Sequence, residues 1–153
     1  MSVVLDMPQT SLYGVGGFED KADVRDYDPW EHARMLGIPV VYRTDLPEAD
    51  MVACYSEEYS AIFVRPDLHG AVERCAIAHE IVHFEHGDVG TDASQEERAD
   101  RIAARRLIRP RRLAELAGIT DDPAVVALEL DVTEKLMRTH LRMQRQSGLP
   151  RHD

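Results

Sequence analysis

Two histidines four residues apart, with a glutamate directly after the first, are the residues in this sequence best suited to carry chemistry. They are His79, Glu80 and His83. Four residues make about one helical turn, so on a helix both imidazoles extend from the same face. Two such rings can ligate one Zn²⁺, and Glu80 would then lie beside the ion, where a general base acts on water.

Two other interpretations of this pattern stay open: histidines that are buried and satisfied within a core, or histidines that face solvent. The other residues of segment 76–84 are almost all apolar, which predicts a helix buried on most sides. Burying an unpartnered set of two histidines and a glutamate is costly. We therefore favour a metal site over both alternatives.

A zinc site of the catalytic kind needs a third protein ligand and one open position. Glu96 and Asp100 are four residues apart on a predicted helix, and both border its buried stripe of Ala99, Ala103 and Leu107. We predict Glu96 as the third ligand and Asp100 as the acceptor of a ring N–H from one metal-binding histidine. Glu97 lies about 100° further round the helix and should be more exposed. The alternative is a helix that simply begins with acidic residues.

His86 is a competing third ligand, because seven residues bring it back to nearly the same helix face as His79. It would lie about 10.5 Å further along the axis, which is long for two imidazoles on one ion. A role at the helix C-terminus or in substrate contact is the better assignment. The spacing identifies no donor for an oxyanion, for which Tyr59 and His86 are the candidates.

Length and composition predict one globular α+β domain. The chain has 153 residues, 44% hydrophobic and 30% charged. Capping and stop residues predict a helix from Asp28 to Gly37, and β-rich runs predict strands at 39–43, 51–55 and 59–64, the last two as a hairpin. We expect a small three-stranded antiparallel sheet packed on the helices. Further helices are expected up to Gly87, over 94–108, around 113–117, after 123 and from 133.

We divide the chain into an N-terminal arm (1–26), a core that carries the site (27–110), a helical C-terminal subdomain (111–147) and a frayed tail (148–153). The net charge of −10 is uneven. Residues 1–100 hold 7 Lys and Arg against 21 Asp and Glu, and residues 101–153 hold 11 against 7. The acidic part would repel nucleic acid, whereas the C-terminal part could attract it.

Residues 124–141 have the spacing of a helix-turn-helix, with a tight turn at Asp131. The second predicted helix begins with Thr133, Glu134 and Lys135, which is a poor set for phosphate contacts. We therefore favour packing or protein docking by these helices, and nucleic-acid binding is the weaker alternative.

The N-terminal residues have neither the basic region nor the apolar core of a signal peptide, and no window has the length of a membrane span. We therefore expect a cytosolic protein that does not enter a membrane. Cys54 and Cys75 are expected to be small buried hydrophobic residues in a reducing compartment, although one disulfide stays possible.

Segments 78–83 (AHEIVH) and 96–108 (EERADRIAARRLI) together resemble the ImmA/IrrE family of metallopeptidases. The resemblance extends over about 27–145, with Arg98 in place of the family's usual Glu and Ile102 in place of an aromatic residue. It implies a minimal zincin of the thermolysin-like gluzincin type, with one zinc ion on His79, His83 and Glu96 and with Glu80 as base.

The resemblance also implies a function, the cleavage of a cytosolic transcriptional repressor, as in phage or stress regulation. In zincins the strand before the metal-binding helix offers its edge to the substrate, so 59–64 is the expected peptide-binding edge. The alternative function is a catalytically silent zinc protein that regulates by binding DNA or a repressor through its C-terminal helices.

Overall fold

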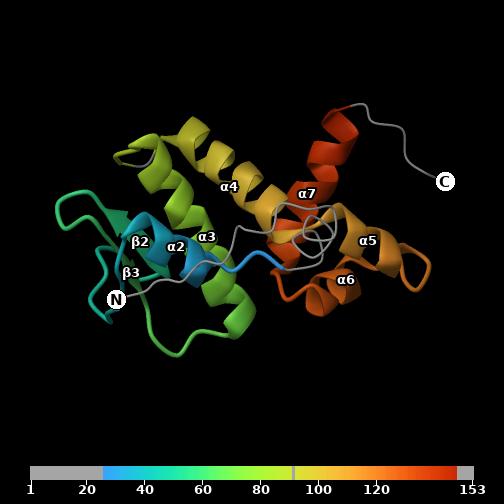
Figure 1. Ribbon diagram of the computed structural model, residues 1–153, viewed down its shortest axis with the longest axis horizontal. Coiled ribbons are helices and arrows are strands. Elements are labelled where there is room, and N and C mark those ends of the chain that lie inside the picture. Colours follow the sequence, from blue (N-terminus) through green and yellow to red (C-terminus); the bar gives the residue numbers. More distant parts are fainter. Residues whose placement is uncertain (1–25, 91, 148–153) are drawn as a thin grey trace, which may run out of the picture.

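The computed structural model describes residues 26–90 and 92–147 as six helices and a three-stranded sheet, which confirms an α+β fold. The sheet and α2 lie at one end of the molecule, α5, α6 and α7 lie at the other, and α3 and α4 connect the two ends (Figure 1). The predicted tail and all of the predicted arm except Asp26 lie outside the described residues. The elements are α2 (Pro29–Leu36), β1 (Val40–Tyr42), β2 (Ala53–Ser56), β3 (Ala61–Val64), α3 (Gly70–His86), α4 (Ala93–Leu107), α5 (Pro110–Ala117), α6 (Pro123–Glu129) and α7 (Glu134–Gln146).

The prediction of an all-antiparallel sheet is wrong. The strand order is β1-β3-β2: β2 and β3 form the expected antiparallel hairpin, but β1 pairs with β3 in parallel. The reason is the connection 43–52, which carries the chain past β3 to the opposite edge. Arg65 fixes this connection, because its guanidinium donates to the carbonyl oxygens of Thr44 (3.0 Å), Met51 (2.9 Å), Glu48 and Ala49 (both 3.3 Å).

Helix α3 is buried on two sides, as its apolar composition predicts. Ile77 and Ile81 are fully buried in a cluster that includes Ile62 and Val64 of the sheet. Ala78, also fully buried, belongs to a second cluster with residues of α4, α6 and α7. The two clusters fix the rotation of α3 about its axis, and therefore the direction in which its polar side chains point.

The predicted helix boundaries are confirmed where a capping residue marks them. Asp28 caps α2 by accepting from the backbone N–H groups of Trp30 (3.0 Å) and Glu31 (3.2 Å), and Gly37 ends the helix with φ 76°. Gly87 ends α3 with φ 65°. A positive φ is readily accessible to glycine and disfavoured for other residues, so both positions give a sharp stop.

The C-terminal helices share a core with α3 and α4. Leu107 of α4, Val126 of α6 and Met137 of α7 belong to the cluster that contains Ala78, so this core extends across the predicted boundary at residue 110. Helices α6 and α7 form the expected helix pair, and Asp131 in the turn between them has φ 57°. The pair is attached to the rest of the molecule through contacts between α7 and α4 and through the core cluster shared with α3.

A buried arginine attaches this turn to α3. The Arg74 side chain donates to the carbonyl oxygens of Leu130 (3.3 Å), Asp131 (2.9 Å) and Tyr27 (3.0 Å). Only 8% of Arg74 is exposed. Arg74, five residues before His79 on α3, therefore joins three segments that are far apart in sequence.

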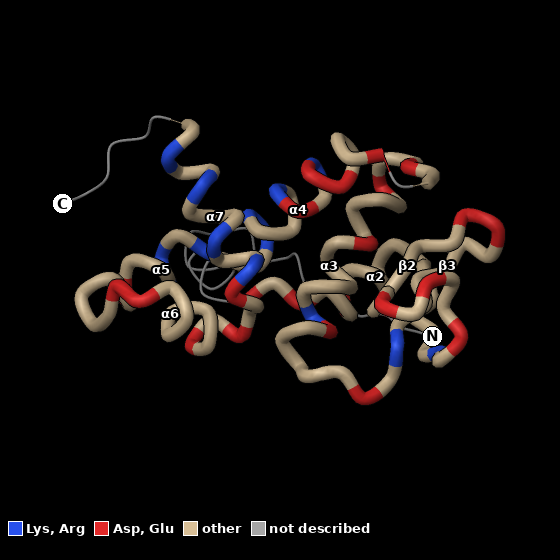
Figure 2. The backbone as a smooth tube through the Cα atoms, turned by 180° about the vertical axis from the view of Figure 1, so that it is seen from behind, with Lys and Arg blue, Asp and Glu red and all other residues tan. Residues whose placement is uncertain are grey.

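The charge asymmetry of the sequence is visible in space. Figure 2 shows Lys and Arg on α7 and where α4 runs into α5, whereas the turns of the sheet are acidic. Among the described residues, none of the helices combines the length and the hydropathy needed to cross a membrane.

Replacing Arg74 by Met should lower the free energy of unfolding by about 3 kcal/mol, because three carbonyl groups lose a charged donor in a largely dry environment. Chemical denaturation measures this effect. The matched control is Arg34→Met on the exposed face of α2, which should change stability by less than about 0.5 kcal/mol. Equal stability of the two variants would contradict the role given to Arg74.

Candidate metal centre

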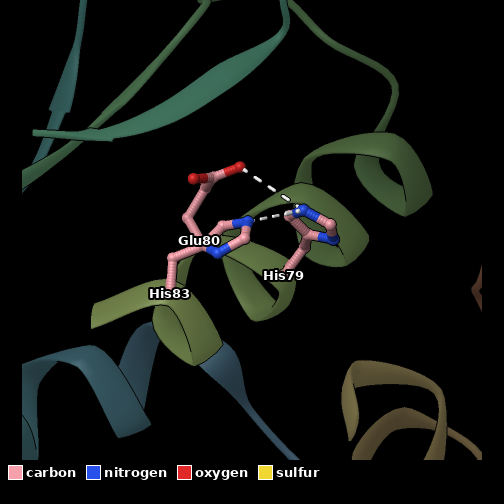
Figure 3. A group of neighbouring side chains, drawn as sticks. All are labelled: His79, Glu80 and His83. Carbon is pink, nitrogen blue, oxygen red and sulfur yellow. Dashed lines mark hydrogen bonds and ion pairs between the residues drawn. The ribbon is translucent and has the colours of Figure 1, made fainter. Parts of the chain in front are cut away.

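The side chains of His79 and His83 converge beside α3, and Glu80 lies next to them (Figure 3). The two Nε2 atoms are 3.1 Å apart. Glu96, on α4, reaches both rings: its Oε1 lies 3.1 Å from His79 Nε2 and its Oε2 lies 2.8 Å from His83 Nε2. The structure therefore brings together the two histidines and the predicted third ligand.

A carboxylate holds the other nitrogen of each ring. Asp100 Oδ1 lies 2.8 Å from His79 Nδ1, which confirms the predicted contact between this carboxylate and a histidine of the site. Asp88 Oδ2 lies 3.0 Å from His83 Nδ1. Asp88 was missed in the sequence, although its position directly after the helix stop at Gly87 was the available signal. Only 4% of its side chain is exposed, and it also pairs with Arg98 at 2.6 Å.

These contacts make the residues fit a divalent cation. When each Nδ1 donates its proton to an aspartate, both Nε2 atoms present a lone pair, and a carboxylate faces the same point. Three electron-pair donors at 2.8–3.1 Å repel one another unless a proton or a cation lies between them. Tetrahedral zinc separates its ligands by about 3.3 Å, so a small outward adjustment would accommodate the ion. Two imidazoles and one carboxylate are a donor set that zinc accepts.

Glu80 occupies a different position from Glu96. Its Oε1 accepts a hydrogen bond of 2.8 Å from the backbone N–H of Tyr55 in β2, and its Oε2 lies 4.0 Å from His79 Nε2. Possible ligand atoms of His79, Glu80 and His83 all lie within 4.8 Å of one another, so Glu80 is near enough to compete as a ligand. Glu96 is the better third ligand, because its oxygens contact both rings at 3.1 Å or less.

Burial and neighbouring charges shift the pKa values of the side chains at this site. Burial raises the pKa of Glu80, and the nearby histidines oppose this only in part. Burial by itself lowers the pKa of His79, but the Asp100 hydrogen bond and the surrounding carboxylates outweigh it, so that pKa is raised. Burial by itself raises the pKa of Asp100, but the hydrogen bond from His79 and the nearby positive charges together outweigh it, so that pKa is lowered.

The other two candidate residues lie outside this group. The side chain of His86 bonds to the Val82 carbonyl through Nδ1 at 3.0 Å and does not join the two histidines. Tyr59 is 63% exposed in the β2–β3 turn, where its ring contacts Phe63 edge-on. Neither contact favours a role in oxyanion binding.

The expected peptide-binding edge at 59–64 is wrong. Strand β3 is the central strand, bonded to β1 on one side and to β2 on the other, so it has no free edge. The edge nearest the site belongs to β2, whose Tyr55 N–H reaches Glu80.

Comparison with protein-family models, with curated proteins and with solved structures found no match for this chain.

Replacing Glu96 by Gln should weaken zinc binding by more than about 100-fold. Removing a charged ligand should cost more metal affinity than removing a residue that only orients a ligand. Titration against a chelating dye measures the affinity. Glu97→Gln is the matched control, since Glu97 is exposed and pairs with Arg101. Equal affinity of the two variants would exclude Glu96 as a ligand.

Zinc affinity should fall as the pH drops through the raised pKa of His79. A raised pKa keeps the proton on His79 up to a higher pH, and that proton competes with the ion, so binding releases protons. Replacing Asp100 by Asn should move the loss of affinity to lower pH, because the charged acceptor that stabilises the imidazolium is gone. Dye competition between about pH 5.5 and pH 8 covers the range in which histidine titrates. A constant affinity over this range would contradict the assignment.

Proposed function

We propose that this protein is a zinc-dependent endopeptidase of the ImmA/IrrE type, with the gluzincin arrangement of one ion on His79, His83 and Glu96. One observation carries the proposal: two Nε2 atoms and a carboxylate from the next helix converge within 3.1 Å, and the side chain of Glu80 lies beside them with 13% of its surface exposed. A structural zinc site is usually closed by a fourth protein ligand. Because Glu80 accepts from β2, a zinc ion on the other three ligands would keep one position open for water.

The residues of the chain divide the work of peptide hydrolysis. A zinc ion held by these ligands supplies Lewis acidity, which lowers the pKa of water and polarises a carbonyl group. Glu80 takes the proton of the attacking water on its carboxylate and returns it to the leaving amine. Its raised pKa suits both steps, because a group that must accept and then donate a proton works best when its pKa lies close to the pH of the reaction. Asp100 and Asp88 keep the two rings in one tautomer and orientation.

The edge of β2 is the natural place for the substrate backbone. Tyr55 directs its N–H away from β3 and toward Glu80, so this edge borders the reacting groups. An extended peptide that adds to a sheet edge gains backbone hydrogen bonds without regard to its sequence. A peptide paired with β2 would pass beside Glu80 and the histidines.

The proposed substrate is a cytosolic regulatory protein, most simply a transcriptional repressor, as the family resemblance implies. The packing of α7 favours this proposal over direct DNA binding. In a DNA-binding helix-turn-helix, the first residues of the second helix reach base edges in the major groove. Here Thr133, Lys135 and Leu136 line a cavity that also contains His79 and Glu80.

Replacing Glu80 by Gln should abolish peptide cleavage, with a rate loss of at least about 100-fold to 10,000-fold, because the base is lost. The amide oxygen of the introduced glutamine can still accept from the Tyr55 N–H, so folding and zinc content should not change. Mass spectrometry of a randomised octapeptide library, incubated with the zinc-loaded chain, measures cleavage.

The control is Glu58→Gln in the exposed β2–β3 turn, which should cleave like the parent chain. Cleavage by the Glu80→Gln variant at the parent rate would reject Glu80 as the base. Regulation in the cell that survives this substitution would favour the catalytically silent regulator.

A further inference from the structure

The metal-site residues open into a cavity of about 280 Å³ whose walls come from four parts of the chain. His79, Glu80, Glu96 and Asp100 lie on one side. The others are Val52 and Ala53 at β2, a stretch of α3 before His79, and the first turns of α7. A group in this cavity would therefore contact the C-terminal helices and the reacting residues together.

The lining of this cavity contains one cationic side chain, Lys135, among the described residues. Apolar side chains such as Val72 and Leu136 make up much of the remaining wall. The carboxylates are already engaged: Glu96 faces both histidines, Asp100 holds His79, and Glu80 accepts from β2.

Lys135 forms no ion pair with any residue that the structure describes, in contrast to Arg138 one turn later, which pairs with Glu134. The backbone of Lys135 is nevertheless well fixed. Thr133 caps α7 by accepting from the Leu136 N–H at 3.1 Å, and its own N–H lies 3.5 Å from the Cys75 sulfur of α3. Leu136 is only 7% exposed. A rigid backbone with an unpaired ammonium at a cavity wall is suited to ligand recognition.

We propose that Lys135 is a specificity-determining residue that binds a substrate carboxylate, so that the enzyme selects peptides with Asp or Glu close to the scissile bond. The apolar wall beside it would accept a neighbouring aliphatic side chain. This inference rests on the proposed peptidase function, because it assigns the substrate class of that same cavity. The carboxylate belongs to a side chain or to a peptide C-terminus, and both sources offer the same acceptor to the ammonium.

The test measures binding in a chain that does not turn over. The full-length, zinc-loaded Glu80→Gln variant is immobilised and offered randomised octapeptides, half with free and half with amidated C-termini. Sequencing of the retained peptides should show Asp and Glu enriched about two- to fivefold, the range expected for one exposed ion pair. Asp and Glu enrichment in the amidated half assigns the carboxylate to a side chain, whereas preferred retention of peptides with free C-termini, without Asp and Glu enrichment, assigns it to the chain end.

A charge swap identifies the residue. Adding Lys135→Glu should replace the acidic enrichment by enrichment of Lys and Arg, whereas Lys135→Met should remove the charge preference and keep the aliphatic one. The matched control is Arg145→Glu, which changes the net charge equally at an exposed position near the end of α7, outside the cavity lining. That variant should still retain acidic peptides.

Acidic enrichment that survives Lys135→Glu, or retained peptides without any charge preference, would overturn the inference. Library cleavage by the parent chain separates this result from the proposed function. If the parent chain cleaves the library, but its preference among peptides does not depend on Lys135, the inference is rejected and the proposed function stands. If retention of acidic peptides depends on Lys135, but the parent chain cleaves none of them, the proposed activity is rejected and the inference stands.

Discussion

The structure depends on holding three electron-pair donors closer together than they would lie by themselves. His79 Nε2, His83 Nε2 and the Glu96 carboxylate lie within 3.1 Å of one another, and the second nitrogen of each ring is already engaged by an aspartate. Without a proton or a cation between them, this arrangement is repulsive and partly desolvated. The packing of the fold must offset this unfavourable free energy. A bound cation would relieve the repulsion, and this relief would contribute to its binding free energy.

The packing of α3 and α4 supplies that support. The sheet covers one side of α3, and α4 with the C-terminal helices covers the other. This packing keeps α3 from turning about its axis, so the face that carries the histidines stays toward Glu96. Arg98 compensates the charge of buried Asp88, which in turn orients His83. Arg74 fixes the α6–α7 turn against α3 and therefore sets where α7 meets the cavity. The C-terminal helices thus contribute to the site through packing, in addition to any surface they offer to a partner.

Much of this site could be predicted from local sequence rules. A four-residue spacing places His79 and His83 on one face in any helix, and the inward stripe of α4 orients Glu96 and Asp100. The ends of α2 and α3 were also predictable, because a capping residue acts on backbone groups within a few positions of it. All of these features depend on contacts within a few residues.

The features that sequence reasoning missed depend on contacts between distant segments. The parallel pairing of β1 follows from the path of residues 43–52, which Arg65 fixes through carbonyl groups that any residue carries. Asp88 reads as an ordinary polar residue after a helix stop, until His83 and Arg98 are seen to enclose it. Lys135 reads as part of a weak DNA-binding helix, and only the fold places it in the cavity wall.

The most direct test of the central claim is anomalous X-ray diffraction from crystals of the zinc-loaded chain, recorded on both sides of the zinc absorption edge. The account predicts one anomalous peak at ligand distance, about 2.0–2.2 Å, from His79 Nε2, His83 Nε2 and a Glu96 oxygen, with Glu80 outside that shell. A peak elsewhere, or one ligated by Glu80 in place of Glu96, would contradict it.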